Sequence, residues 1–192
     1  MTWTARADRL VQTILAPGAA AHIEARARDL LSPALGLILD VGCGFASPLV
    51  RLAVPHIGVD IDFARIKAAD RCGGVVVADA VALPFADSTF AATVSIGLLH
   101  HLADAAARRA VGEMMRVVQP DGPVVILDGV RPAAARQRPL AAAIRALDRG
   151  RHMRDEGALL ALFDGIPGWR HERVTYAATG LEGVWCIRPP AG

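Results

Sequence analysis

From Leu35 onward, short apolar runs alternate with alanine-rich stretches that carry scattered charges. The apolar runs are continuous and rich in β-branched residues: LGLILDV, HIGVDI, GVVVAD, AATVSIG and GPVVILDG. The stretches between them have the length and composition of helices. Continuous apolar strands separated by helices indicate a parallel sheet that is covered on both faces.

The last part of the chain breaks this alternation. The runs HERVTYAA and GVWCIRP are separated only by Thr179 to Glu182, which is too short for the crossover that parallel strands need. We predict that they pair as an antiparallel hairpin. The expected architecture is an open α/β sheet, mostly parallel, with an antiparallel strand near one edge.

The segment before the sheet pattern has helical periodicity. Pro17 and Gly18 divide it into two short helices, the second of which has apolar residues near helical spacing. We therefore expect residues 1–33 to form an N-terminal helical cap and residues 34–192 to form the main domain.

Charge and composition exclude several classes of protein. The 192-residue chain has a net charge of +2, and Lys67 is the only lysine among its 21 Lys and Arg residues. It has no basic stripe interleaved with aromatic residues, so we do not expect a nucleic-acid partner. No apolar run approaches the roughly 18 residues of a membrane-spanning helix.

Targeting and redox signals favour a cytoplasmic protein. The APGAAA segment near the N-terminus follows a short apolar stretch with polar interruptions, so we do not expect a signal peptide. Cys43, Cys72 and Cys186 lack the spacing of a metal site. We expect reduced thiols and no metal.

Ligands of open α/β sheets bind where the strands end. After the first run, Asp40 precedes Gly42 and Gly44, and glycines let the backbone turn sharply and approach a ligand. Asp60 ends the second run, where a carboxylate can accept hydrogen bonds from both hydroxyls of a ribose. A helix N-cap is the alternative role, but it suits Asp62 better. The two loops indicate a nucleoside ligand, although a structural tight turn would have the same glycines.

Five motifs then follow in register: LILDVGCGFAS, GVDID, DAVALPFADSTFA, GLLHHL and VGEMMRVVQPDGPVVILD. Their order and spacing resemble the class I S-adenosylmethionine-dependent methyltransferases, in particular the small-molecule branch with the ubiquinone and menaquinone biosynthesis enzymes. The resemblance is strong from Leu35 to Asp128 and concerns only topology beyond. It implies a Rossmann-like, seven-stranded fold and S-adenosylmethionine as cofactor. NAD is disfavoured because Ser47 replaces the third glycine of its fingerprint.

The resemblance also implies roles for individual residues near the methionine part of the cofactor. Gly42 and Gly44 would pass beneath it, and Asp40 would organise its ammonium group. Cys43 would contribute its backbone. The full set of implied cofactor-binding residues is Asp40, Gly42, Cys43, Gly44, Phe45, Asp60, Ile61, Asp79, Ala80, Ser95, Ile96 and Gly97.

The nucleoside part would lie over the next strands. Asp60 would hold the ribose hydroxyls, with Ile61 beside it. Asp79 would accept a hydrogen bond from the adenine amino group, and the backbone N–H of Ala80 would face the ring. Residues 95–97 would border the sulfonium and the methyl acceptor.

Three positions depart from the family pattern. Phe45 places an aromatic ring where a small polar residue is common, which would shape the methionine end or the mouth of the acceptor pocket. Ala46 replaces a glycine, and Ala91 replaces an aspartate. The loss at Ala91 should be mainly structural, but because of Phe45 and Ala46 a non-catalytic cofactor-binding or scaffold protein of the same fold stays as an alternative.

The implied reaction is an in-line displacement that gives S-adenosylhomocysteine and a methylated small molecule. The sulfonium is already activated, so the protein would mainly position the reactants and exclude water. An oxygen acceptor would also lose a proton, which His100 or His101 could accept. Both histidines could instead pack or cap the loop.

Residues 131–154 contain seven arginines and a single acid, Asp148. One interpretation is a solvated helix surface. The other is a site for an anionic acceptor, or for peripheral contact with an anionic membrane. We expect a monomer or homodimer.

Overall fold

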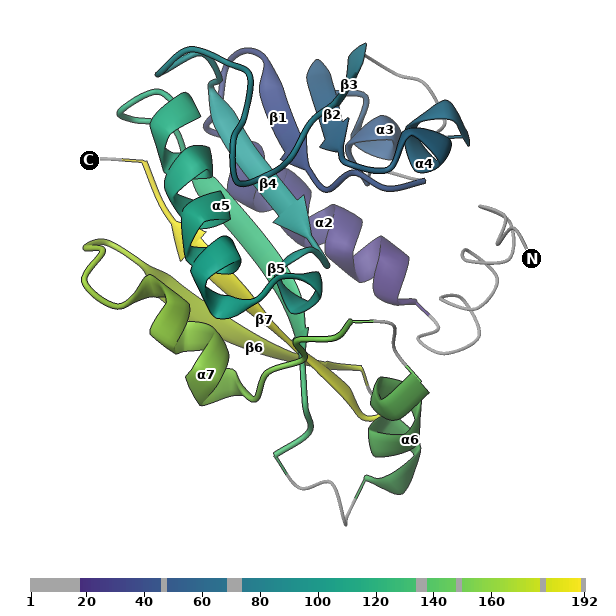
Figure 1. Cartoon of the computed structure of the whole chain (residues 1–192). Helices are drawn as coiled ribbons and strands as arrows, with labels where there is room; N and C mark the ends of the chain where they lie inside the picture. The colour runs from purple at the N-terminus through teal and green to yellow at the C-terminus, as the bar shows by residue number, and fades with distance from the viewer. Residues whose placement is uncertain are drawn as a thin grey trace.

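The computed structural model describes residues 18–45, 48–68, 74–133, 138–147, 150–176 and 179–190. Its strands form one seven-stranded sheet with the order β3-β2-β1-β4-β5-β7-β6 (Figure 1). The strands are β1 (Ile38–Val41), β2 (His56–Asp60), β3 (Gly74–Val77), β4 (Ala92–Ile96), β5 (Val124–Val130), β6 (Arg170–Tyr176) and β7 (Leu181–Arg188). The predicted α/β class and number of strands are confirmed.

Strands joined by long connections pair in parallel, and the two strands joined by a short turn pair antiparallel. Strands β1 to β5 pair in parallel, whereas β7 is antiparallel to both β5 and β6. The predicted C-terminal hairpin is therefore confirmed. Its second strand lies inside the sheet, between β5 and β6.

Helices cover both faces of the sheet (Figure 1). They are α2 (Ala19–Leu31), α3 (Pro48–Leu52), α4 (Phe63–Ala68), α5 (Asp104–Val117), α6 (Pro139–Leu147) and α7 (Glu156–Leu160), with the short 3₁₀ helices η1 (Leu99–His101) and η2 (Ala161–Phe163). One core contains buried residues of α5, α7 and η2, and a second contains those of α2 and α3. The first predicted N-terminal helix lies outside the described residues.

Alternation along β5 sends its side chains to both cores. Val124 and Ile126 belong to the core under α5, and Val125 and Leu127 to the core under α2. Because successive strand residues point to opposite faces, Asp128 points to the same face as Ile126. That face carries α5 and η1.

The helix α2 contributes Ala27, Leu30 and Leu31 to the second core. The described part of the predicted cap therefore packs on the sheet. The domain boundary after residue 33 stays a prediction.

The strand order reverses at β1. The chain continues from β1 to β2 and β3 on one side, and then crosses to β4 on the other side of β1. In open α/β sheets, ligands bind beyond the carboxyl ends of the strands at such a switch point. The loops after β1, β2, β3 and β4 therefore form the candidate site.

Candidate cofactor and acceptor site

The loop after β1 folds back onto β2. The backbone N–H groups of Gly42 and Cys43 both donate to the Val59 carbonyl, over 2.7 and 3.0 Å. Gly42 has φ +78° and Gly44 has φ +57°, a region that L side chains rarely adopt. A Cβ on Gly42 would lie 3.0 Å from Leu98. Both the turn and the close approach to Leu98 therefore favour glycine.

Asp60 joins this loop to the end of β2. Its Oδ2 accepts from the Gly44 backbone N–H at 3.0 Å, and its Oδ1 accepts from the Asp62 N–H at 2.9 Å. The residue is only 9% exposed. Asp62 caps α4, as expected, because its Oδ1 accepts from the N–H groups of Ala64 and Arg65. The ribose contact of Asp60 stays a prediction.

Cys43 fills space beneath the loop. A Cβ on Gly58 of β2 would lie 2.7 Å from the Cys43 Sγ. Burial, followed by the negative charges of Asp40 and Asp60, raises the pKa of the Cys43 thiol to about 12. The thiol is therefore protonated at neutral pH and acts as a small packed group rather than a nucleophile.

Two further positions of the predicted set differ in exposure. Asp40 is buried in β1, whereas Ile61, directly after β2, is 67% exposed.

The Phe45 ring is half-buried and lies beneath the Arg65 guanidinium, with 5.6 Å between the Arg65 Cζ and the ring centroid. This cation–π contact connects the glycine loop to α4. Ala46 and Ser47 lie outside the described residues.

The loop after β3 carries Asp79 and Ala80. The Asp79 side chain is exposed, and its Oδ1 accepts from the Val81 N–H at 3.1 Å. Ala80 is buried. The Asp79 side chain is therefore accessible, and its contact with adenine stays a prediction.

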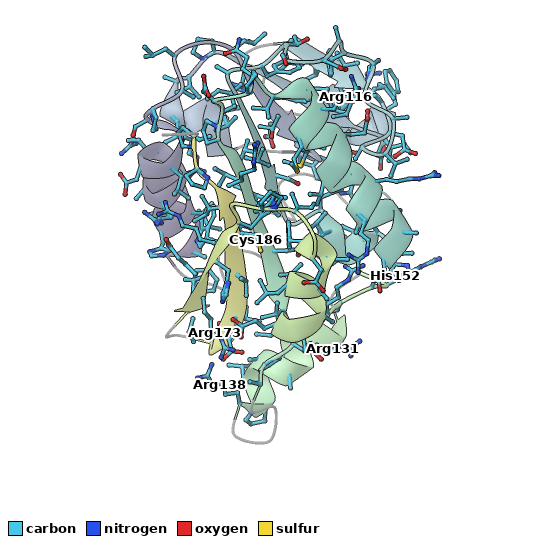
Figure 2. All side chains as sticks on the ribbon, turned by 90° about the vertical axis from the view of Figure 1, so that its left-hand side faces the viewer. Arg116, Arg131, Arg138, His152, Arg173 and Cys186 are labelled. Atoms are coloured by element: carbon cyan, nitrogen blue, oxygen red, sulfur yellow. The ribbon has the colours of Figure 1, made fainter. Side chains whose placement is uncertain are left out.

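A pair of α5 residues holds the next part of this loop. Glu113 accepts from the Leu83 N–H at 2.8 Å and from the Arg116 guanidinium. Arg116 also donates to the carbonyls of Leu83 and Phe85. Figure 2 shows Arg116 at the end of α5 opposite to His152. In the sequence, Glu113 and Arg116 are recognisable only as an i, i+3 pair, so their hydrogen bonds to the loop after β3 were not predicted.

The end of β4 lies between β1 and β5. The Ser95 hydroxyl is fully buried and donates to the Val41 carbonyl at 2.8 Å. Gly97 has φ +73°, and its N–H donates to the Leu127 carbonyl. Ile96 is half-buried. The Ser95 side chain holds strands together, so only its backbone can border a ligand.

The helix η1 follows and brings His100 onto β5. The His100 N–H donates to Asp128 Oδ2 at 3.0 Å, and its ring Nδ1 lies 2.5 Å from Asp128 Oδ1. Both residues are buried. The neighbouring His101 is exposed, with its ring centroid 4.1 Å from that of His100. Asp128 lies at the end of a quoted motif but was not predicted as a site residue.

The segment 150–154 covers η1. The buried Arg154 donates to the carbonyls of Leu99 and Leu102 and to Asp104 Oδ1. The His152 N–H donates to the His100 carbonyl at 3.0 Å. Arg154 therefore fixes the loop between β4 and α5.

This finding corrects part of the interpretation of the arginine-rich stretch. Arg154 is an internal anchor, and Arg138 forms an ion pair with the buried Glu182. Arg131 and Arg151 are exposed. Figure 2 shows Arg131 and Arg138 at the end of the molecule where α6 lies. The described arginines of this stretch thus form neither a uniform solvated surface nor a uniform basic patch, and Arg136 and Arg149 lie outside the described residues.

Among the described residues, no group of three or more His, Cys, Asp or Glu side chains could hold a metal ion. In the same part of the chain, no helix is both long and apolar enough to cross a membrane.

Comparison with known proteins agrees with this geometry. Residues 39–126 match the family model described as a methyltransferase domain. This segment is therefore similar to methyltransferase domains. The match and the fold confirm the predicted resemblance to class I, S-adenosylmethionine-dependent methyltransferases.

Two relatives of this segment have names that indicate different substrates. The tRNA (carboxymethyluridine(34)-5-O)-methyltransferase of Arabidopsis thaliana is 41% identical over 97 residues, which cover 49% of this chain and 24% of the relative. The demethylmenaquinone methyltransferase of Roseiflexus castenholzii is 36% identical over 110 residues, which cover 52% of this chain and 45% of the relative. The chain thus spans less than half the length of these two relatives.

A solved structure supports the fold. Geranyl diphosphate methyltransferase in complex with SAM aligns with a TM-score of 0.65 and 15% identity, covering 91% of both chains.

Proposed function

We propose that this protein transfers the methyl group of S-adenosylmethionine to a small-molecule acceptor. The observation that carries the proposal is the joint geometry of the loops after β1 and β2. Gly44 has a positive φ, and a Cβ added to it would meet, among the described residues, only the Gly42 carbonyl oxygen at 4.0 Å. Among the described residues, none would block the approach of a ligand at this point, and the Asp60 carboxylate is fixed beside it.

The residues present suit the parts of this cofactor. Gly42 and Gly44 would lie under its methionine part, with Asp40 near its ammonium group. The second acceptor lone pair of each Asp60 oxygen would take a ribose hydroxyl. The exposed Asp79 carboxylate, with the Ala80 N–H, would take the adenine edge. Phe45, Cys43, Ile61 and residues 95–97 complete the proposed surface.

When bound, the cofactor supplies an activated methyl group, and the chain positions the acceptor in line with it. For a hydroxyl acceptor, the His100 ring would take the proton while the acceptor oxygen attacks the methyl carbon. The carbon–sulfur bond breaks, and its electron pair stays on sulfur. His101, which is exposed beside it, is the second candidate for this role.

The binding step is tested by calorimetry with S-adenosylhomocysteine and S-adenosylmethionine. We expect micromolar binding of both, and absence of binding by either would overturn the proposal. Incubation of a metabolite extract with methyl-labelled cofactor then identifies the product. Binding without any labelled product would favour the non-catalytic alternative.

A tRNA acceptor is the second candidate, because the Arabidopsis thaliana relative is named as a tRNA methyltransferase. The same labelling experiment with total tRNA distinguishes the two. Label in a nuclease-sensitive fraction, with none in small molecules, would replace the small-molecule acceptor by tRNA.

A further inference from the structure

His100 is attached to Asp128 at two points. The Asp128 carboxylate accepts from the His100 backbone N–H through Oδ2 and contacts the ring Nδ1 through Oδ1. The Gly129 N–H also donates to Oδ1, at 2.7 Å. An ionised carboxylate oxygen can only accept a hydrogen bond, so the ring nitrogen that contacts it must carry the hydrogen. The neutral ring therefore carries its proton on Nδ1, and Nε2 is its basic nitrogen.

Two glycines border the His100 ring on its other edges. A Cβ on Gly97 would lie 3.6 Å from the His100 Cε1. A Cβ on Gly150 would lie 2.2 Å from Cδ2 and 2.9 Å from the His100 carbonyl oxygen. Because Nε2 is bonded to both Cε1 and Cδ2, it lies at the end of the ring between the two glycines. Only glycine at position 150 leaves room for the ring in this orientation.

The titratable groups around the ring come from several elements. Asp128 belongs to β5, and Cys186 of β7 is close enough for the Asp128 charge to raise the pKa of its thiol. The His101 ring of η1 is tilted by 43° relative to the His100 ring, with 4.1 Å between the ring centroids. Arg154 and Asp104 form an ion pair on the carbonyls of the η1 loop. Among these groups, the contact with Nδ1 is made by Asp128.

We infer that Asp128 is a positioning residue that holds His100 in the Nδ1–H tautomer, and that Gly150 provides the space for that orientation. The inference rests on the proposed function, in which His100 accepts a proton. It also favours an acceptor that loses a proton on methylation, such as a hydroxyl compound, over a carboxylate, which has no proton to lose. The hydroxyl proton would move to Nε2 while the oxygen bonds to the methyl carbon and the carbon–sulfur bond breaks, with its electron pair left on sulfur.

The tautomer is measured first, without acceptor or turnover. In ¹⁵N-labelled full-length protein, with His100→Asn used to assign the signal, we expect the neutral His100 ring to be protonated at Nδ1. Asp128→Ala removes the acceptor of the Nδ1 proton and should shift the ring towards the Nε2–H tautomer. A wild-type ring protonated at Nε2, or an Asp128→Ala ring that remains wholly Nδ1–H, would overturn the inference.

The second variant is Gly150→Ala, which displaces the ring and leaves Asp128 in place. Its matched control is Gly112→Ala on the exposed face of α5, where a Cβ meets no described atom within 4 Å. We expect the His100 ring signals to change in Gly150→Ala and not in Gly112→Ala. Unchanged His100 ring signals in Gly150→Ala would contradict the proposed position of the His100 ring next to Gly150.

Turnover separates this inference from the proposed function. Asp128→Ala should lower labelled-product formation on the order of 10²-fold, with S-adenosylhomocysteine affinity within twofold of wild type. The pH at which the rate rises should also move to a lower value, because the negative charge that favours imidazolium is gone. If the tautomer changes and product formation does not, the base role of His100 in the proposed function is wrong, while the tautomer assignment stands.

Discussion

The Gly44 backbone N–H donates to Asp60 Oδ2 over 3.0 Å, so one carboxylate fixes the ends of two neighbouring strands. The glycine loop and the acidic residue were separate motifs in the sequence. In the fold they form one unit, and the position of the loop depends on the Asp60 side chain.

Asp60→Ala should therefore affect both stability and binding. We expect the free energy of unfolding to fall by about 1–3 kcal/mol, because the N–H groups of Gly44 and Asp62 lose their acceptor. Affinity for S-adenosylhomocysteine should fall roughly 10- to 100-fold if the carboxylate holds the ribose. Urea unfolding and calorimetry measure the two effects.

Asp62→Ala is the matched control for Asp60→Ala. It removes the N-cap of α4 and should cost about 1 kcal/mol of stability with binding unchanged. Equal affinity in the two variants would refute the ribose contact.

Glu113 should make stability depend on pH. The hydrogen bond from Arg116 is the main reason that the pKa of Glu113 lies below its usual 4.5. Since the folded state binds this proton less tightly, the stabilisation is complete above about pH 4.5 and is lost as pH falls through the folded-state pKa. Glu113→Gln should lower Tm at pH 7 and weaken the Tm decrease between about pH 5 and pH 3.

Circular dichroism melts across this pH range measure the Glu113 effect. The exposed Asp121→Asn serves as control and should follow the wild-type curve. A Glu113→Gln curve parallel to wild type at every pH would show that the Glu113–Arg116 pair does not contribute.

Arg154→Ala should be far more damaging than Arg151→Ala. Removal of the buried Arg154 leaves the Leu99 and Leu102 carbonyls without their donor, so we expect a loss of about 2–4 kcal/mol. The exposed Arg151 should change stability by less than about 0.5 kcal/mol. Chemical denaturation measures both, and similar losses would mean that Arg154 does not anchor η1.

Cys43 and Cys186 should resist thiol reagents in the folded protein. Burial is the main reason that both thiols have a pKa of about 12, so almost no thiolate exists at pH 8. In a Cys72→Ser variant, Ellman's reagent should react at once in guanidinium chloride and at least about 10²-fold more slowly in buffer. Fast reaction of the folded variant would place a thiol at the surface.

The sequence predicted those parts of the fold that local patterns determine. Continuous apolar runs such as ILDV and VVIL indicated buried parallel strands, and the short connection before Leu181 indicated the hairpin. It did not predict that β7 would lie between β5 and β6, because strand order depends on packing between distant segments. The family motifs predicted which loops meet at the site.

The unpredicted site contacts join residues that are distant in sequence. The Glu113–Leu83 and His100–Asp128 contacts span 30 and 28 residues. In the sequence, Asp128 follows an apolar run and could not be distinguished from any other polar residue at the end of a strand. The Phe45–Arg65 contact also requires the turn of the glycine loop towards α4.

The position of β7 has a consequence for biosynthesis. β6 emerges from the ribosome before β7, yet its strand partner in the sheet is β7. The nascent sheet therefore ends at β5 until Leu181–Arg188 has been made, and the β5 edge is exposed for that interval. Exposed strand edges promote association between chains. Nascent-chain aggregation should thus depend on how quickly the last strand is translated and inserted.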